Sequence, residues 1–109
     1  MTIPLTVEAT DANFEQEVLR CPVPVLVDFW AQWCPPCRSL SPVVDEVAAE
    51  TTGTAKVIKV NVEDNPELTR RYKVQSVPLL LFSKDGAVRE RVTDATDKAV
   101  LLSRLAALL

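Results

Sequence analysis

The 109-residue sequence contains no histidine, only three cysteines and only two glycines, at positions 53 and 86. Without histidine, the chain cannot supply a Cys–His or Ser–His catalytic pair or a His-ligated metal. With so little glycine it also lacks the glycine-rich loop that cradles a dinucleotide, so we expect no bound cofactor. Three cysteines are too few for a disulfide-stapled secreted scaffold. An activated cysteine in this chain must therefore depend on backbone groups, charges or carboxylates.

The sequence also lacks an excess of positive charge and any long apolar run. The net charge of −3 argues against nucleic-acid binding through a basic surface. No segment reaches the roughly 18 unbroken apolar residues of a membrane helix. Met1–Pro4 shows no basic region leading into an apolar stretch, so we expect no secretory signal and favour a cytoplasmic location. Residues 1–109 match the commonest size of one domain.

Apolar periodicity and turn residues predict an α/β domain in the order βαβαβαββα. Strands are predicted at 3–7, 25–30, 55–62, 79–83 and 87–92, and helices at 10–19, 34–50, 65–72 and from about 94 to the C-terminus. The strand–helix–strand connections imply a parallel central portion, and the turn at Asp85-Gly86 adds an antiparallel edge. Pro42 lies inside the second helix and is expected to kink it.

Three of the four predicted helix starts carry residues that can cap them. The expected caps are Thr10 or Asp11 for the first helix, Asn65 for the third, and Asp94 or Thr96 for the last, whereas the second helix is expected to begin at about Cys34. The expected buried stripes combine Phe14 with Val18 in the first helix, and Leu40, Val44, Val47, Ala48 and Thr51 in the second. In the last helix they combine Leu101, Leu105 and Leu108.

Two cysteines stand three positions apart, in Trp33-Cys34-Pro35-Pro36-Cys37, directly after the apolar run 25–30. A strand that delivers Cys34 to the start of a helix places its sulfur where backbone N–H groups and the helix dipole favour a thiolate. That arrangement suits thiol–disulfide exchange. The alternatives are two buried structural cysteines or half a zinc site, although structural zinc normally takes four Cys or His ligands.

Asp28 is a carboxylate in the middle of an apolar strand. Burial of an unpaired charge is costly, so its pKa should be raised. Lys59, in the neighbouring predicted strand, is the candidate partner. The alternative is that Asp28 and Lys59 form only a tolerated polar pair.

Several motifs together resemble the thioredoxin family over essentially the whole chain. They are the segment 25–37, Pro42, the segment 59–63, Val77-Pro78 and Asp85-Gly86. A Cys-x-x-Cys pair alone is a weak signal, but this one follows Trp-Ala-x-Trp and precedes a Val-Pro before a strand. The resemblance implies a thioredoxin fold, with a central mixed five-stranded sheet flanked by four helices.

The resemblance also implies a reaction. Cys34 would attack a substrate disulfide and form a mixed disulfide, and Cys37 would resolve it, leaving a Cys34–Cys37 disulfide. Asp28 would accept the proton of Cys37, and Lys59 would tune Asp28. The redox-active disulfide would replace a bound cofactor or metal.

Substrate contacts follow from the same resemblance. The Val77–Pro78 bond would be cis and pack against the disulfide, with the Val77 backbone exposed to an extended substrate segment. The alternative for Pro78 is a plain strand-start proline. Trp33 would complete an apolar collar around Cys34, and Trp30 would pack behind it. The implied partners are disulfide-containing proteins and a thioredoxin reductase, with the chain acting as a monomer.

Three positions depart from the family pattern: Pro35 and Asp94 replace glycines, and Leu79 replaces a threonine. Pro35 and Pro36 each remove a donor from the first helical turn, leaving the N–H groups of Cys37 and Arg38 to face the sulfur. Fewer donors raise the thiol pKa, whereas a stiffer loop changes the relative strain of the two redox states, so the direction of the potential shift stays open. The Arg38 charge either helps the thiolate or is solvated.

Two other functions fit parts of the pattern. The non-glycine dipeptide between the cysteines permits a disulfide oxidant or isomerase, against which the missing export signal and histidine argue. A binding module with incidental redox activity is the third hypothesis. Cys21, at the turn before the central strand, is expected to be partly buried without a redox role, with a regulatory or intermolecular disulfide as the alternative.

Overall fold

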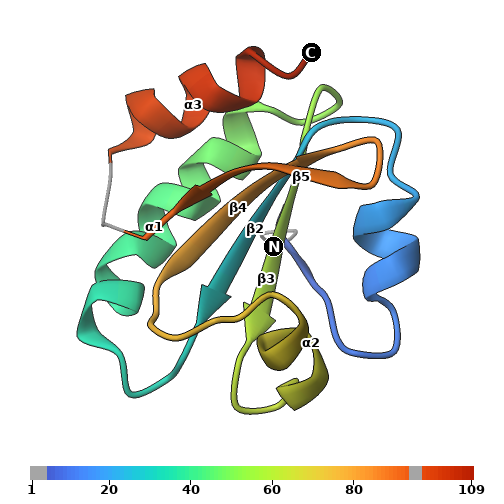
Figure 1. Ribbon diagram of the computed structural model, residues 1–109. Coiled ribbons are helices and arrows are strands. Elements are labelled where there is room, and N and C mark those ends of the chain that lie inside the picture. The colour runs from blue at the N-terminus through green and yellow to red at the C-terminus, as the bar shows by residue number, and fades with distance from the viewer. Residues whose placement is uncertain (1–4, 94–96) are drawn as a thin grey trace.

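The computed structural model describes residues 5–93 and 97–109, and within them five strands form one sheet in the order β1-β3-β2-β4-β5 (Figure 1). The strands are β1 Val7–Glu8, β2 Val25–Trp30, β3 Lys56–Asn61, β4 Leu79–Lys84 and β5 Ala87–Val92. The helical segments are a π-helical turn η1 Glu15–Leu19, α1 Pro35–Glu50, α2 Pro66–Arg71 and α3 Lys98–Ala106. The order confirms the predicted βαβαβαββα arrangement. Among the described residues, no helix is both long and apolar enough to span a bilayer.

The sheet is parallel on one side and antiparallel on the other. β1, β3 and β2 are parallel, as the long return through α1 predicts. β4 is antiparallel to β2, although a helix also precedes it. The six-residue α2 rises only about 9 Å, less than half of a strand's length of about 20 Å, so it leaves the chain at the end of the sheet where β3 finished (Figure 1). The β4–β5 hairpin turns at Asp85 and Gly86, which both have positive φ, 54° and 81°.

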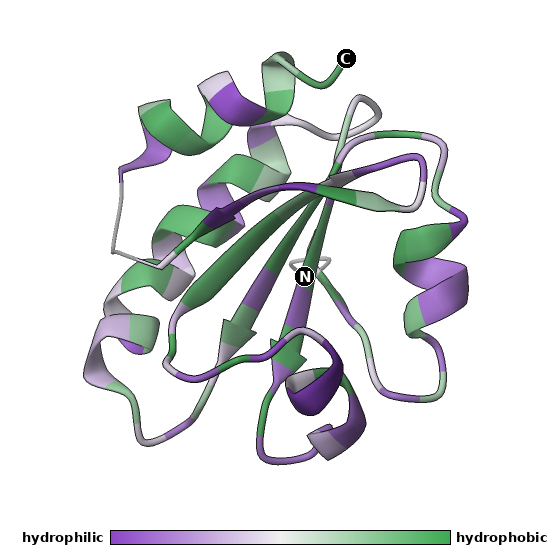
Figure 2. Cartoon of the chain, in the orientation of Figure 1, coloured by the Kyte–Doolittle hydropathy of each residue, from purple (hydrophilic) through white to green (hydrophobic). Residues whose placement is uncertain are grey.

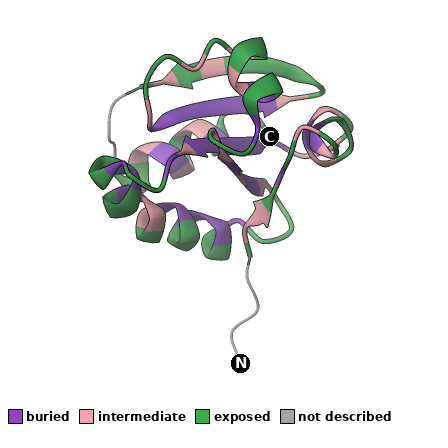
Figure 3. Cartoon of the chain, turned by 90° about the horizontal axis from the view of Figure 1, so that it is seen from below, coloured by how far each residue is buried: buried purple, intermediate pink, exposed green. Residues whose placement is uncertain are grey.

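Both faces of the sheet are covered, which explains the continuous apolar run of β2. Val25, Val27 and Phe29 belong to a cluster with η1 and α2, whereas Leu26 packs with α1 and α3. Figure 2 shows the central strands as mainly hydrophobic between these layers, and Figure 3 shows their buried ribbon enclosed by more exposed helices. The predicted stripes are confirmed as buried at Phe14, Val18, Leu40, Val44, Val47, Ala48, Thr51, Leu101 and Leu105. Leu108 is half-buried and lies beyond the end of α3.

The first strand and its flanking helix differ from the prediction. The strand was expected at 3–7, of which residues 3 and 4 lie outside the described residues, but β1 begins at Val7, where it can pair with Ile58 and Lys59 of β3. The following segment winds into only one regular turn, η1. Thr10 accepts from the Ala12 N–H, ahead of η1, but the expected cap is wrong, because η1 follows Phe14 and has no side-chain cap.

The capping groups of two helices were predicted wrongly. Asp11 caps α2 rather than the first helix: its carboxylate accepts the N–H groups of Glu67 (3.3 Å) and Leu68 (2.9 Å). Asn65, at the N-cap position of α2, instead accepts the Asp11 N–H and makes no side-chain cap. The last helix is capped by the Asp97 side chain, and the expected caps Asp94 and Thr96 lie outside the described residues.

Candidate active site

The two cysteines of the motif are joined in a disulfide at the N-terminus of α1. Cys34 is the N-cap residue in extended conformation, and Pro35 and Pro36 occupy the first two helical positions, where a missing N–H costs no helical hydrogen bond. The Cα atoms of Cys34 and Cys37 are 5.3 Å apart. Both cysteines are buried, at 2% and 3% exposure, whereas the two prolines between them are exposed.

Among the described residues, the backbone gives the Cys34 sulfur one donor. The N–H of Cys37 points at Cys34 Sγ at 3.2 Å. The N–H of Arg38, which we also expected to face the sulfur, is bonded to the carbonyl oxygen of Cys34 at 3.2 Å. The helix therefore offers the sulfur a single hydrogen bond together with the positive end of its dipole.

The loop before β4 covers the disulfide from the other side. The Val77–Pro78 peptide bond is cis, as the family resemblance implied, and the Val77 carbonyl oxygen lies 3.6 Å from Cys34 Sγ. Within the described residues the Val77 N–H makes no hydrogen bond. Trp33 is 65% exposed and lines a shallow surface hollow together with Val77. An accessible backbone and an exposed indole thus flank the sulfur.

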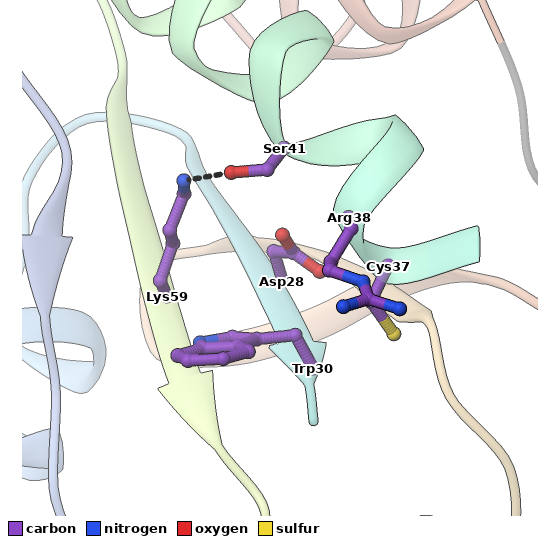
Figure 4. A pocket seen from close by; sticks show the side chains of 6 residues that line it. All are labelled: Asp28, Trp30, Cys37, Arg38, Ser41 and Lys59. Carbon is purple, nitrogen blue, oxygen red and sulfur yellow. Dashed lines mark hydrogen bonds between the residues drawn. The ribbon is translucent and has the colours of Figure 1, made fainter. Parts of the chain in front are cut away.

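Behind the disulfide lies a cavity of about 220 Å³, lined by Asp28, Trp30, Cys37, Arg38, Ser41 and Lys59 (Figure 4). Asp28 is 2% exposed, and its Oδ1 makes no hydrogen bond within the described residues. Burial raises the pKa of Asp28 to about 7, the Lys59 charge lowers it and the Asp45 charge raises it. A carboxylate with its pKa near neutrality, facing the same cavity as Cys37, is equipped to exchange a proton with that thiol.

Lys59 lies beside Asp28, but its ammonium contacts side chains of α1 instead. The two residues are register partners on β3 and β2, so their side chains leave the same face of the sheet. The Lys59 ammonium, however, donates to Ser41 Oγ at 2.8 Å and pairs with Asp45 Oδ1 at 2.9 Å. Figure 4 shows the lysine directed at Ser41, with the Asp28 carboxylate opening into the same cavity. Lys59 therefore acts on Asp28 through space.

The structure brings together most of the residues singled out from the sequence. Trp30 packs behind the disulfide as expected, and Arg38 lines the cavity. Cys21 is half-buried, unoxidised and packed against the core on the η1 side. No group of three Cys, Asp or Glu side chains suited to a metal gathers within the residues that the structure describes.

Sequence reasoning missed Ser41 and Asp45. The sequence pattern that could have found them is the four-residue spacing of Cys37, Ser41 and Asp45, which places the three side chains along one face of α1.

Comparisons with known proteins agree with this geometry. A family model described as Thioredoxin matches residues 5–107. "Thioredoxin 1" of Synechococcus elongatus is 48% identical over 96 residues, covering 88% of this chain and 90% of the relative. The thioredoxin of Pyropia yezoensis is 48% identical over 98 residues, covering 90% and 92%. The thioredoxin of Pseudomonas aeruginosa is 46% identical over 99 residues, covering 91% and 92%.

Proposed function

The chain belongs to the thioredoxin family and is a thiol–disulfide oxidoreductase, and we propose that it works in the reducing direction, on the disulfides of other proteins. The observation that carries the proposal is the Cys34–Cys37 disulfide at a helix N-terminus, with Asp28 in the cavity behind it. We further propose that residues 1–109 act as one domain and as a monomer. The redox-active disulfide is then the only redox group required, without a bound cofactor or metal.

In the first step, Cys34 is the nucleophile. With the active site reduced, the Cys34 thiolate attacks one sulfur of a substrate disulfide, the substrate S–S bond breaks, and the other substrate sulfur leaves as a thiolate that takes up a proton. The Cys37 N–H and the helix dipole stabilise the attacking thiolate. Pro35 and Pro36 tune this step, because they leave the sulfur without further donors from the first helical turn.

In the second step, Cys37 resolves the mixed disulfide. Asp28 accepts the proton of the Cys37 thiol, directly or through a water, for which the cavity has ample room. The Cys37 thiolate attacks Cys34 Sγ, the mixed disulfide breaks, and the second substrate sulfur leaves as a thiolate that takes up a proton. The substrate gains two electrons and two protons, and Cys34–Cys37 becomes the disulfide again. Lys59 tunes Asp28 through its charge.

Substrates bind beside the sulfur. The Val77 N–H, which makes no hydrogen bond within residues 5–93 and 97–109, and the Val77 carbonyl oxygen suit pairing with an extended segment of the substrate. Pro78 fixes the loop, and Trp33 supplies apolar contact. A thioredoxin reductase is the partner that returns two electrons to the disulfide. Such a cycle belongs in the cytoplasm, where protein thiols are kept reduced.

The reduction potential tests the direction of the reaction. The protein is equilibrated in dithiol/disulfide buffers and followed by tryptophan fluorescence, with thiol trapping as a check. A two-electron transition near about −270 mV, the value known for thioredoxin itself, supports the reductase. A value near about −180 mV, as in disulfide isomerases, would overturn the reducing assignment. Protein-disulfide reduction that survives Cys34→Ser would overturn the role of Cys34.

A further inference from the structure

Within the part of the chain that the structure describes, the Lys59 ammonium has two partners, and both come from α1. Ser41 Oγ accepts from Nζ at 2.8 Å, and Asp45 Oδ1 lies 2.9 Å away. The two partners differ in environment, because Ser41 lines the cavity whereas the Asp45 side chain is 57% exposed. The Lys59 side chain itself is only 16% exposed. One contact therefore keeps the ammonium at the cavity, and the other draws it toward solvent.

Because α1 holds the Lys59 ammonium, the buried Asp28 carboxylate forms no ion pair with this neighbouring cation. Asp28 is the register partner of Lys59, and within the described residues no ion pair joins them. A lysine side chain is flexible, so its ammonium can pair with either neighbouring carboxylate, that of Asp28 or that of Asp45. Pairing with Asp28 would strongly favour the ionised carboxylate and make it a weak base. The contacts to α1 prevent that pairing.

We propose that Ser41 and Asp45 are positioning residues for the proton transfer at Cys37, because together they fix the Lys59 ammonium near Asp28 without letting it pair with that carboxylate. They touch neither the substrate nor the reacting sulfurs. They act through Lys59, whose distance from Asp28 sets how readily Asp28 holds a proton. The inference rests on the proposed role of Asp28 as the proton acceptor.

The groups around Asp28 determine in which direction each substitution on α1 moves its pKa. Lys59 faces Asp28 from β3, and Cys37 and Arg38 line the same cavity from α1. Asp45, further along α1, acts on Asp28 by its charge, and the register partner of Asp28 on β4, Leu80, is apolar. In Asp45→Asn protein, we expect Ser41 alone to hold Lys59, whose ammonium then lies deeper in the cavity, so Asp28 ionises more easily. When the Ser41 hydroxyl is removed, Lys59 follows Asp45 outward, so Asp28 ionises less easily.

The test is the titration of Asp28 in the intact oxidised protein, followed by carboxyl ¹³C NMR. We expect Asp45→Asn to lower the midpoint by about half a pH unit or more, and Ser41→Ala to raise it by a few tenths of a unit. Glu46→Gln is the matched control, since it removes the same charge from the next, exposed position of α1 and is expected to move the midpoint less. A midpoint unmoved by both Asp45→Asn and Ser41→Ala would overturn the proposal.

A second background separates positioning from direct charge. In Lys59→Gln protein there is no ammonium to hold, so Ser41→Ala should leave the midpoint unchanged and the Asp45→Asn shift should fall to less than half. Shifts of the same size in both backgrounds would show that Asp45 acts by its charge alone, and the positioning role would be lost.

Kinetics then distinguish this inference from the function on which it rests. The pH dependence of mixed-disulfide resolution by Cys37 should shift with the NMR midpoint in each variant. If the NMR midpoints move as expected while the resolution profile stays fixed, Ser41 and Asp45 do position Lys59 but Asp28 is not the proton acceptor. That outcome overturns their role in proton transfer and the proposed role of Asp28 together. Another outcome is that the Asp28 midpoint stays fixed in the Ser41 and Asp45 variants while Lys59→Gln shifts the pH dependence of resolution. That outcome would overturn the positioning role alone.

Discussion

Two rows of side chains on the α1 side of the sheet lie one pleat apart and behave in opposite ways. In the first row Leu26 of β2 pairs with Val57 of β3, and both are buried in an apolar cluster. In the next row Asp28 pairs with Lys59 and lines a cavity. The same two strands therefore carry close-packed core at one position and, two residues further along, a carboxylate that pairs with no other described residue.

The contrast shows how one sheet combines stability with chemistry. Burying an aliphatic side chain such as Leu26 contributes about 1.5–3 kcal/mol, whereas burying the Asp28 charge opposes folding. Rows that exclude water hold the strands in register, and that register places Asp28 behind Cys37. The row with the buried carboxylate is stable only because its neighbours are apolar.

Loss of the nucleophile has the largest expected effect on activity. Cys34→Ser removes the thiolate, so reduction of protein disulfides should fall to the uncatalysed rate while the fold persists. Turnover with a reductase or dithiol as electron source, together with circular dichroism, measures both. Cys21→Ser is the matched control and should retain full activity, because Cys21 lies on the opposite, η1 side of the sheet. A Cys21→Ser protein without activity would contradict this assignment.

Truncating a side chain in the apolar row, formed by Leu26 and Val57, should lower the stability of the fold without changing the catalytic rate. Leu26→Ala removes a side chain with 0% exposure, so the free energy of unfolding should fall by about 2–5 kcal/mol. Denaturant unfolding gives that value. Turnover per folded molecule should match that of the unaltered protein. A large loss of activity in fully folded Leu26→Ala protein would break the division between the two rows.

Removing the charge from the polar row should stabilise the protein at neutral pH. The pKa of Asp28 is about 7 in the folded protein and near its ordinary value when unfolded, so folding stability is lost as pH rises from about 4 to 7. Asp28→Asn should remove this loss, and its advantage should grow over that window to as much as about 4 kcal/mol. Urea unfolding at a series of pH values measures it. An advantage independent of pH would show that Asp28 is not buried in its charged form.

The same variant should slow resolution of the mixed disulfide, because Asn accepts no proton from Cys37. Rapid mixing with a disulfide substrate and acid trapping separates this step from the attack by Cys34. Equal rates of resolution in Asp28→Asn and unaltered protein would remove Asp28 from the mechanism.

Much of this contrast was predictable from local sequence. The run 25–30 defined β2 correctly, and Pro35-Pro36 fixed the first turn of α1 because proline suits those positions. Asp28 was recognisable as a carboxylate in an apolar strand, and its raised pKa is confirmed. These features depend on neighbours in sequence or on a repeating pattern, so the sequence alone was enough to find them.

The features that escaped prediction depend on contacts between distant segments. Asp11 caps α2 across 57 positions, so a reading of adjacent residues assigned it to the wrong helix. Lys59 was assigned to Asp28 because they occupy neighbouring strands, but two side chains of α1 offered its ammonium better partners. Side-chain pairing between elements follows from packing, which periodicity does not specify.

The smallest effect on stability is expected at the surface beside Cys34, outside both rows. Trp33 is 65% exposed, so Trp33→Ala should change the free energy of unfolding by no more than about 0.5 kcal/mol. It should nevertheless raise KM for protein disulfides by about threefold to tenfold, because an exposed indole contributes apolar contact only to a bound partner. A small-molecule disulfide, which reaches Cys34 without covering Trp33, should be reduced at an unchanged kcat/KM. If both substrates suffer equally, Trp33 acts on the reactivity of Cys34 and not on substrate binding.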